Sequence, residues 1–323
     1  MSTILVTGGA GYIGSHACKA LARAGYTPVC YDNLERGHAW AVKWGPLELG
    51  NILYRERLDE VLQKYKPDAV MHFAGYIAVG ESVEKPRLYH EINVKGSRTL
   101  IEALIANKIN KIIFSSSAAI YGMPEQIPIA ESHPINPVNP YGENKAEVER
   151  MLAEFNETSD LRSVSLRYFN AAGADPDRET GEAHNPETHL IPLVLDTAAG
   201  LTPDIKIFGN DYDTRDGTCI RDYIHVTDLV EAHLLALDAL LQDAKSTTYN
   251  LGSGTGCSVM EVIAAARQVT GKEIPVTVTE RRAGDVDVLV CSSDQIKTEL
   301  GWQPQYSDLD TIIKTAWQWH EKR

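Results

Sequence analysis

The amino-acid sequence predicts an α/β protein built on a doubly wound parallel sheet, followed by a smaller and irregular C-terminal lobe. Short apolar runs rich in β-branched residues alternate with amphipathic segments of helix length, and this rhythm breaks down after Asn170. Such alternation is typical of parallel strands joined by crossover helices. The length of 323 residues allows one large α/β domain or two modest domains.

The individual elements follow from these patterns in chain order. Strands are expected at residues 4–7, 28–31, 69–73, 111–115 and 163–168, and helices at 13–24 and 93–106. Residues 171–220 are rich in Gly, Pro, Asp, Asn and Thr, and only one helix is expected there, at 190–199. Further helices are expected at 227–241, 258–270 and 309–320, and further strands at 248–251 and 275–279. We therefore expect a first domain of residues 1–172 and a lobe of residues 173–323, with segments near 226–252 returning to the main sheet.

Charge and composition narrow the possible function classes. A net charge of −13 argues against a protein that follows a nucleic-acid backbone. No run approaches the ~20 apolar residues needed to cross a bilayer. Met1 leads directly into a strand pattern without a cleavable leader, so we expect a cytoplasmic protein with no membrane partner. The five cysteines are scattered and form no C-x-x-C pair, so disulfides and a zinc site are not expected, and no metal ligands are predicted.

The opening segment ILVTGGAGYIGSH places a strand, a glycine turn and a helix start in succession. Gly8 permits a tight turn, Gly11 lets the backbone approach a pyrophosphate, and Gly14 lets the helix pack closely on the strand. Asp32 follows 24 residues after Gly8, where an acid can bind ribose hydroxyls and would repel a 2′-phosphate. The segment predicts a Rossmann-type site for NAD, in preference to NADP; a glycine turn without a ligand is the alternative. Arg36 nearby is expected to be a solvated charge.

A second group of residues carries possible acid–base chemistry. The run FSSSAAIYG puts Ser115–Ser117 at the carboxyl end of a predicted buried strand, where ligands sit in open α/β sheets. In the segment NPYGENKAEVERM, Tyr141 and Lys145 are four residues apart and share one helical face. A lysine ammonium and an oxidised nicotinamide would together lower the pKa of a phenol from ~10 by roughly three units. Tyr141 is thus a candidate base, Lys145 its activator, and Ser117 a hydrogen-bond partner of the reacting oxygen. Y-x-x-x-K alone is more often a surface pair, but the preceding glycine turn and serine-ended strand favour the catalytic interpretation.

The blocks TGGAGYIG, HFAGYIAVGES, FSSSAAIYG, PYGENK, LRYFNAAGA and DGTCIRDYIHVTDL extend almost from end to end. With them the chain resembles the UDP-glucose/galactose 4-epimerases of the extended short-chain dehydrogenase family. The resemblance implies an isomerase that oxidises C4 of a UDP-sugar with tightly bound NAD, turns the 4-keto sugar over and reduces its other face. It also implies a homodimer formed through helices near 93–106 and 143–158. Residues 1–172 would then hold NAD, and residues 173–323 the UDP-sugar.

The resemblance also assigns residues to each part of the site. The catalytic residues would be Tyr141, Lys145 and Ser117. The cofactor would contact Gly8, Gly11, Tyr12, Ile13, Gly14, Asp32, Asn33, Asn51, Ile52, Phe73, Ala74, Gly75, Asn93, Ser115, Tyr141, Lys145 and Tyr168. The UDP-sugar would contact Ser117, Tyr141, Asn170, His189, Leu190, Arg221, Arg282, Asp285 and Leu289. Two arginines suit a diphosphate, because guanidinium groups match phosphate oxygens. For each charged residue the alternative is a surface ion pair, and for an aromatic such as Phe169 it is core packing.

Departures from the family pattern concern affinity and specificity. Asn51 replaces an aspartate, Ile77 a cofactor-contacting lysine, and Ala119 a threonine found in some members. Leu289 aligns with the position that faces the sugar's 2-substituent, and its bulk favours UDP-galactose over UDP-N-acetylgalactosamine.

Three other functions compete with this interpretation. The first is a nucleotide-sugar dehydratase or decarboxylase on the same fold. A 4,6-dehydratase would need an acid–base pair at Ala118 and Ala119, whose side chains cannot move protons. A 4-epimerase for UDP-xylose and UDP-arabinose shares every motif and stays open. A non-catalytic NAD-binding regulator would be expected to lack Ser117, Tyr141 or Lys145, and all three are present.

Overall fold

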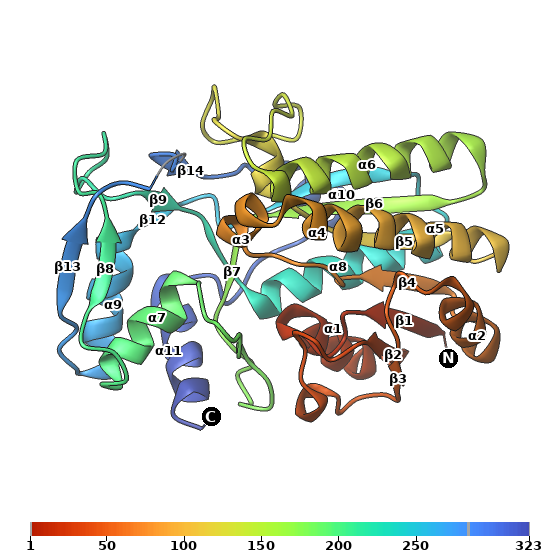
Figure 1. Ribbon diagram of the computed structural model, residues 1–323, viewed down its shortest axis with the longest axis horizontal. Coiled ribbons are helices and arrows are strands. Elements are labelled where there is room, and N and C mark those ends of the chain that lie inside the picture. Colours follow the sequence, from red (N-terminus) through yellow and green to blue (C-terminus); the bar gives the residue numbers. More distant parts are fainter. Residues whose placement is uncertain (1, 283–284, 323) are drawn as a thin grey trace.

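The central feature of the fold is a seven-stranded parallel sheet, seen in a computed structural model that describes residues 2–282 and 285–322 (Figure 1). The strand order is β11-β6-β5-β4-β1-β2-β3, and every neighbouring pair is parallel. From β1 the chain winds to one edge through β2 and β3, and then to the other edge through β4, β5, β6 and β11. The doubly wound α/β class is confirmed. The strands are β1 Thr3–Thr7, β2 Thr27–Asp32, β3 Leu47–Leu49, β4 Ala69–His72, β5 Lys111–Ser117, β6 Arg162–Tyr168 and β11 Thr247–Leu251.

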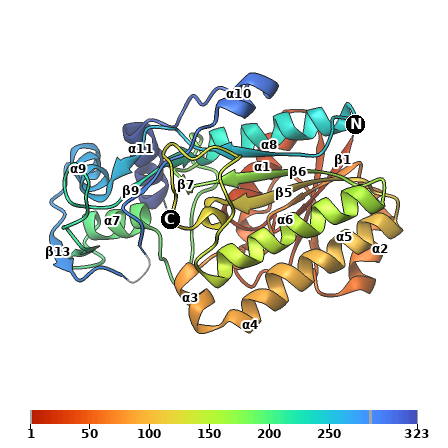
Figure 2. The ribbon, with the colours of Figure 1, turned by 90° about the horizontal axis from the view of Figure 1, so that it is seen from above.

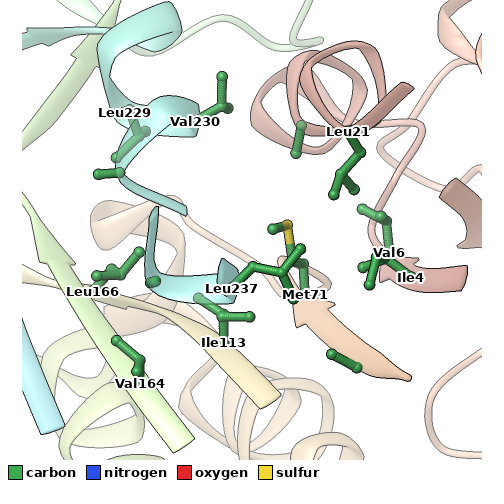
Figure 3. Close-up of a cluster of buried hydrophobic side chains, with 14 of the residues drawn as sticks. Ile4, Val6, Leu21, Met71, Ile113, Val164, Leu166, Leu229, Val230 and Leu237 are labelled. Carbon is green, nitrogen blue, oxygen red and sulfur yellow. The ribbon is translucent and has the colours of Figure 1, made fainter. Parts of the chain in front are cut away.

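Helices cover both faces of this sheet, as Figure 2 shows from above. On one face, α1 and α8 pack against the strands, and Leu21, Leu229 and Leu237 join strand residues such as Val6 and Met71 in one core (Figure 3). On the other face, α2, α5 and α6 bury a second core. Because helices cover both faces of the sheet, side chains on both sides of the central strands are buried, and these strands contain runs of consecutive apolar residues. The helices are α1 Tyr12–Arg23, α2 Arg55–Tyr65, α5 Gly96–Ala106, α6 Pro140–Thr158 and α8 Val226–Leu241.

The second lobe lies beyond the carboxyl ends of the central strands (Figure 1). Short strand pairs and three helices enclose a core of its own, in which α7, α9 and α11 meet. β8 pairs with β13, β9 with β12 and β14, and β10 with β7. The elements are β7 Asn170–Ala172, α7 Leu190–Ala198, β8 Ile205–Phe208, β9 Ile220–Arg221, β10 Tyr223–His225, β12 Cys257–Ser258, α9 Val259–Thr270, β13 Val276–Thr279, β14 Val288–Leu289 and α11 Leu309–His320. The helix α10 Asp294–Leu300 packs instead against α8 and β11 of the main domain.

The structure departs from the predicted elements mainly between β4 and β5. The helix expected to start at residue 93 is preceded by the short helices α3 Val79–Glu84 and α4 Pro86–Tyr89 and by a π-helical segment, His90–Lys95. A π-bulge places an extra residue in a turn and is frequent at functional sites; Asn93 lies within this one. β5 also continues to Ser117, two residues further than expected, before the 3₁₀ turn Ala118–Tyr121. A second 3₁₀ turn covers Ala39–Ala41.

β11 and α8, which come late in the chain, belong to the main sheet and its covering layer. Throughout the described ranges, no helix combines the length and the apolarity that a membrane span requires.

Candidate active site

The glycine turn between β1 and α1 forms a cradle in which Gly8 and Gly14 leave no room for a side chain. Gly8 has φ +74°, and a Cβ there would lie 2.6 Å from the backbone nitrogen of Ala74. A Cβ on Gly14 would lie 2.1 Å from the carbonyl oxygen of Gly8. α1 begins at Tyr12 without a side-chain cap, so its first amide groups and the positive end of its dipole face the turn. Free amides at a helix N-terminus bind phosphate groups, so this part of the site fits a dinucleotide.

Asp32 ends β2 next to this turn and is almost fully buried. Its carboxylate accepts hydrogen bonds from the amides of Ala10 (3.0 Å) and Leu34 (2.8 Å), so one side chain connects the two loops. Burial raises the pKa of Asp32, and the backbone donors oppose that shift. Arg36 forms an ion pair with Glu81 at 3.0 Å. It is therefore not the freely solvated charge that the sequence suggested. The Asp32 carboxylate suits the two hydroxyls of a ribose and would repel a 2′-phosphate, and Arg36 is already paired with Glu81.

The loop after β4 lies across the turn from Asp32. A Cβ on Gly75 would lie 2.9 Å from Oδ1 of Asn93, so the glycine allows a close approach. The Asn93 side chain accepts from the amide of Tyr76 (2.7 Å) and donates to its carbonyl (2.9 Å), which fixes the loop Phe73–Tyr76. The side chain of Asn51 is similarly committed, accepting from the amide of Leu53 at 2.9 Å. The side chains of Asn93 and Asn51 therefore both hold loop backbone in place.

Other predicted cofactor contacts line the same region. Tyr12 anchors the start of α1 by donating to the carbonyl of Gly173 (2.6 Å), which ties the turn to the second lobe. Phe73 packs against His233 of α8, with ring centroids 4.9 Å apart and the ring planes tilted by 35°. Ile13 and Ile52 pack into the two cores, whereas Asn33 is exposed.

The carboxyl end of β5 brings the predicted catalytic residues together. Tyr141 and Lys145 lie on the first turns of α6, which Asn139 caps by accepting from the amide of Gly142 at 2.9 Å. Both side chains are buried, and Lys145 Nζ donates to the carbonyl of Ser115 at 2.7 Å. The same Nζ lies 5.8 Å from the ring centroid of Tyr141.

Two hydroxyls complete this arrangement. The Ser117 oxygen accepts from the amide of Ala119 (3.2 Å) and lies near the Tyr141 phenol. The Tyr168 hydroxyl hydrogen-bonds to the Ser115 hydroxyl.

Burial has the largest effect on the pKa values of Tyr141 and Lys145. Burial raises the pKa of Tyr141 to about 12, and only the Ser117 hydroxyl opposes this shift. Burial also lowers the pKa of Lys145 to about 8, against the pull of the Glu149 carboxylate. The prediction that Lys145 and an oxidised nicotinamide together lower the phenol pKa stays a prediction, because it depends on the charge of the cofactor. Desolvation outweighs the single ammonium group, which points at the Ser115 carbonyl.

A buried ion pair behind the site escaped the sequence analysis. Arg167 of β6 donates to both carboxylate oxygens of Glu149 on α6, at 2.6 to 3.1 Å, and both side chains are less than a tenth exposed. Glu149 also accepts from the Ser116 hydroxyl, and Arg167 donates to the Tyr121 hydroxyl at 2.9 Å. Glu149 follows Lys145 by four residues, about one helical turn. The same spacing that places Tyr141 and Lys145 on one helical face therefore places Glu149 on that face too.

The second lobe contributes a charged cluster. Nη1 of Arg221 donates to the carbonyls of Ile220 (2.9 Å) and Val286 (2.6 Å), and its Nη2 lies 3.8 Å from Asp285. Arg282 Nε donates to the same carboxylate at 3.0 Å and is mostly exposed. The structure therefore brings Arg221, Arg282 and Asp285 together as a cluster with one excess positive charge. Residues 283–284 of the predicted RRAGDV stretch lie outside the described residues.

The remaining predicted substrate residues lie on neighbouring elements. Asn170 donates to the carbonyl of Asp222 at 2.9 Å, where β7 meets β10. Leu190 starts α7 after His189, which pairs with Glu182 and Glu187. Leu289 pairs in register with Arg221. Leu289 and Phe169 both pack at the edge of the small core formed by Ala118, Ile120, Tyr121, Ile129 and Ala146.

Residues 4–252 match the NAD-dependent epimerase/dehydratase family. The chain belongs to this family. A UDP-glucose 4-epimerase of Rhizobium leguminosarum bv. trifolii is 52% identical over 320 residues, which cover 99% of this chain and 98% of the relative.

Two solved structures are also similar. A UDP-glucose 4-epimerase from Brucella ovis in complex with NAD has a TM-score of 0.97 at 49% identity and covers 98% of each chain. One from Bifidobacterium longum in complex with NAD⁺ and UDP has a TM-score of 0.95 at 35% identity, covering 99% of this chain and 98% of the other.

Membership of the NAD-dependent epimerase/dehydratase family agrees with the chemistry of the glycine turn. The turn leaves room where side chains would clash, offers unpaired helix amides and ends beside a buried acid. These features fit NAD, as the sequence predicted. Tyr141 and Lys145 lie on the first turns of α6, on the face of the sheet opposite to α1.

Proposed function

We propose that the protein is a UDP-sugar 4-epimerase that interconverts UDP-galactose and UDP-glucose and keeps NAD tightly bound. The observation that carries this proposal is the convergence of Tyr141, Lys145 and Ser117 at the end of β5, beside a turn that fits a dinucleotide. The strong likeness to UDP-glucose 4-epimerases supports the same function.

The proposed roles follow from the positions of the side chains. NAD, when bound, supplies a hydride acceptor for C4 of the sugar and gives the hydride back to the other face. The Tyr141 phenolate takes the proton of the 4-hydroxyl and later returns it, so the cycle leaves no net proton behind. The Ser117 hydroxyl holds the reacting oxygen within hydrogen-bond reach of Tyr141.

The electrostatics specify what the bound cofactor has to contribute. Burial holds the Tyr141 pKa near 12, so a phenolate at neutral pH needs positive charge beyond Lys145. A nicotinamide cation in this desolvated site would provide that charge. Lys145 remains anchored to the Ser115 carbonyl, with its Nζ 5.8 Å from the ring centroid of Tyr141.

The nucleotide part of the substrate is assigned to the second lobe. Arg221 and Arg282 would neutralise the diphosphate, and Asp285, which lies between them, would accept from a ribose hydroxyl. Asn170, His189, Leu190 and Leu289 are proposed to line the remainder of the substrate site. Holding the nucleotide while the sugar turns about its bond to the diphosphate allows both faces of C4 to reach the same Tyr141.

The decisive experiment incubates the purified protein with a panel of UDP-sugars and no added NAD. We expect UDP-galactose and UDP-glucose to interconvert, and denaturation to release about one NAD per chain. Protein that contains no NAD and consumes added NAD(H) would refute the proposal in favour of an ordinary dehydrogenase. Faster turnover of UDP-xylose and UDP-arabinose would favour the pentose alternative.

We also propose that the protein works as a cytoplasmic homodimer. α5 and α6 run side by side on one face of the sheet, where a partner's helices could pack against them (Figure 2). Light scattering coupled to size-exclusion chromatography tests the dimer directly, and a mass of one chain would refute it.

A further inference from the structure

The segment that joins β7 to α7 gathers four side chains of types that bind metal ions. Glu182, His184, Glu187 and His189 follow one another in the pattern E-x-H-x-x-E-x-H. This pattern has neither a helical nor a strand period, and the residues lie in irregular backbone up to the N-cap of α7 at His189. The fold nevertheless brings one ligand atom from each side chain within 4.8 Å of all the others.

The distances between these atoms resemble those around a four-coordinate ion. The two Nδ1 atoms lie 3.0 and 2.8 Å from the same Oε1 of Glu182. On Glu187, Oε1 lies 3.0 Å from His189 Nδ1 and Oε2 lies 3.7 Å from His184 Nδ1. Ligands bound at ~2.0–2.1 Å in a tetrahedron are ~3.3–3.4 Å apart. Shifts of a few tenths of an ångström would therefore convert the present arrangement into a coordination shell.

One oxygen in the cluster has no partner of its own. The side chains of Glu182 and Glu187 are each only 9% exposed. Oε2 of Glu187 is buried and accepts no hydrogen bond from the described residues. A buried carboxylate oxygen without a donor is costly. Because this oxygen faces His184 from beyond hydrogen-bond range, a cation between them would satisfy it.

A neighbouring acidic cluster shows the contrasting case. Asp175, Asp177 and Glu179 also converge, but Lys19 Nζ lies 2.6 to 2.8 Å from all three carboxylates. A lysine thus supplies the cation there. For Glu182 and Glu187, the ion pairs found within the described ranges involve only the two histidines.

We propose that Glu182, His184, Glu187 and His189 bind a divalent transition-metal ion of the Zn²⁺ type. Imidazole and carboxylate are ligands that Zn²⁺ accepts in closed, four-coordinate sites. The expectation that the chain binds no metal rested on its cysteines, which take no part here. The ion would tie the loop of residues 182–189 to the start of α7, and its role would be structural.

The test uses the NAD-containing protein, purified without a histidine tag and treated with a chelator. Co²⁺ serves as the probe, because its visible absorption reports four-coordinate binding and Zn²⁺ should displace it. We expect saturation near one Co²⁺ per chain and a rise in melting temperature with added metal. Both imidazoles must lose their Nδ1 proton to bind, so metal uptake should also release protons into a weakly buffered solution.

Variants locate the ion and provide the control. His184→Asn and His189→Asn should each weaken Co²⁺ binding at least ~10-fold. His320→Asn should leave it unchanged, because His320 forms an isolated pair with Asp196 at 2.7 Å. If a histidine variant fails to fold, Glu187→Gln tests the site instead. It preserves the shape of the side chain and should also weaken Co²⁺ binding. No uptake at ~1 mM Co²⁺, or uptake that these variants leave unchanged, would overturn the proposal and leave a histidine–glutamate ion-pair cluster.

Discussion

Replacing Arg167 by methionine is expected to destabilise the protein by about 3–5 kcal/mol, because it strands a buried carboxylate. Nε and Nη2 of Arg167 currently form three hydrogen bonds with Glu149, and both side chains are less than a tenth exposed. After the substitution, the Ser116 hydroxyl would be the one described side-chain donor left to that carboxylate. Methionine fills much of the volume, so the loss reports on charge and hydrogen bonding more than on a cavity.

The companion variants identify the cause of that loss. Replacing Glu149 by leucine in the Arg167→Met background should recover at least half of it, since a buried pair exchanged as a whole for apolar residues is often nearly neutral. Full recovery is not expected, because the Tyr121 hydroxyl also loses its 2.9 Å contact with Arg167. The control is Arg55→Met, which removes an exposed 2.8 Å pair with Asp59 and should cost less than ~1 kcal/mol.

The assay is equilibrium unfolding in urea, followed by far-UV circular dichroism at matched NAD saturation, because bound cofactor adds stability by mass action. A double-mutant cycle then gives the coupling energy of the pair. A loss below ~1 kcal/mol for Arg167→Met, or strictly additive effects, would refute the argument and show that water already solvates the Glu149 carboxylate.

Three further predictions concern the proton chemistry, the pH response and the substrate. Tyr141→Phe should retain bound NAD and its circular dichroism spectrum but lose ~10²–10⁴-fold in kcat, and a residual rate above about a tenth would exclude Tyr141 as the principal base. Burial lowers the pKa of His233 from 6.5 to about 4, so stability present above pH 6.5 is lost as the pH falls through that window. In His233→Leu, the free energy of unfolding should fall by ~1.4 kcal/mol less per pH unit across this window. Urea unfolding at pH 7.5, 6 and 5 measures this dependence, and the same dependence on pH in the variant and the wild type would contradict the assignment. Leu289 packs at the edge of the Ala118 core, and the wild type should prefer UDP-galactose over UDP-N-acetylgalactosamine by at least ~10-fold in kcat/KM. Leu289→Ser should narrow that ratio, and an unchanged ratio would place the side chain outside the sugar pocket.

The sequence alone was sufficient wherever a local pattern reports backbone geometry. Alternating apolar runs placed five central strands to within two residues at each end, and the glycine turn fixed where a dinucleotide could lie. The four-residue spacing of Tyr141 and Lys145 put both on one helical face, because helical periodicity is local. The division at residue 172 and the substrate contacts remain predictions of the same kind.

Tertiary structure alone decided which groups are buried and which partners they choose. It committed Lys145 to the Ser115 carbonyl, buried the Tyr141 phenol so that its pKa is raised, and paired Glu149 with Arg167. It also gathered Glu182 and His189 into one cluster through a segment without regular structure. Desolvation and ion pairing depend on atoms brought together from distant parts of the chain or through irregular loops, and the spacing of residues along the sequence does not encode those distances.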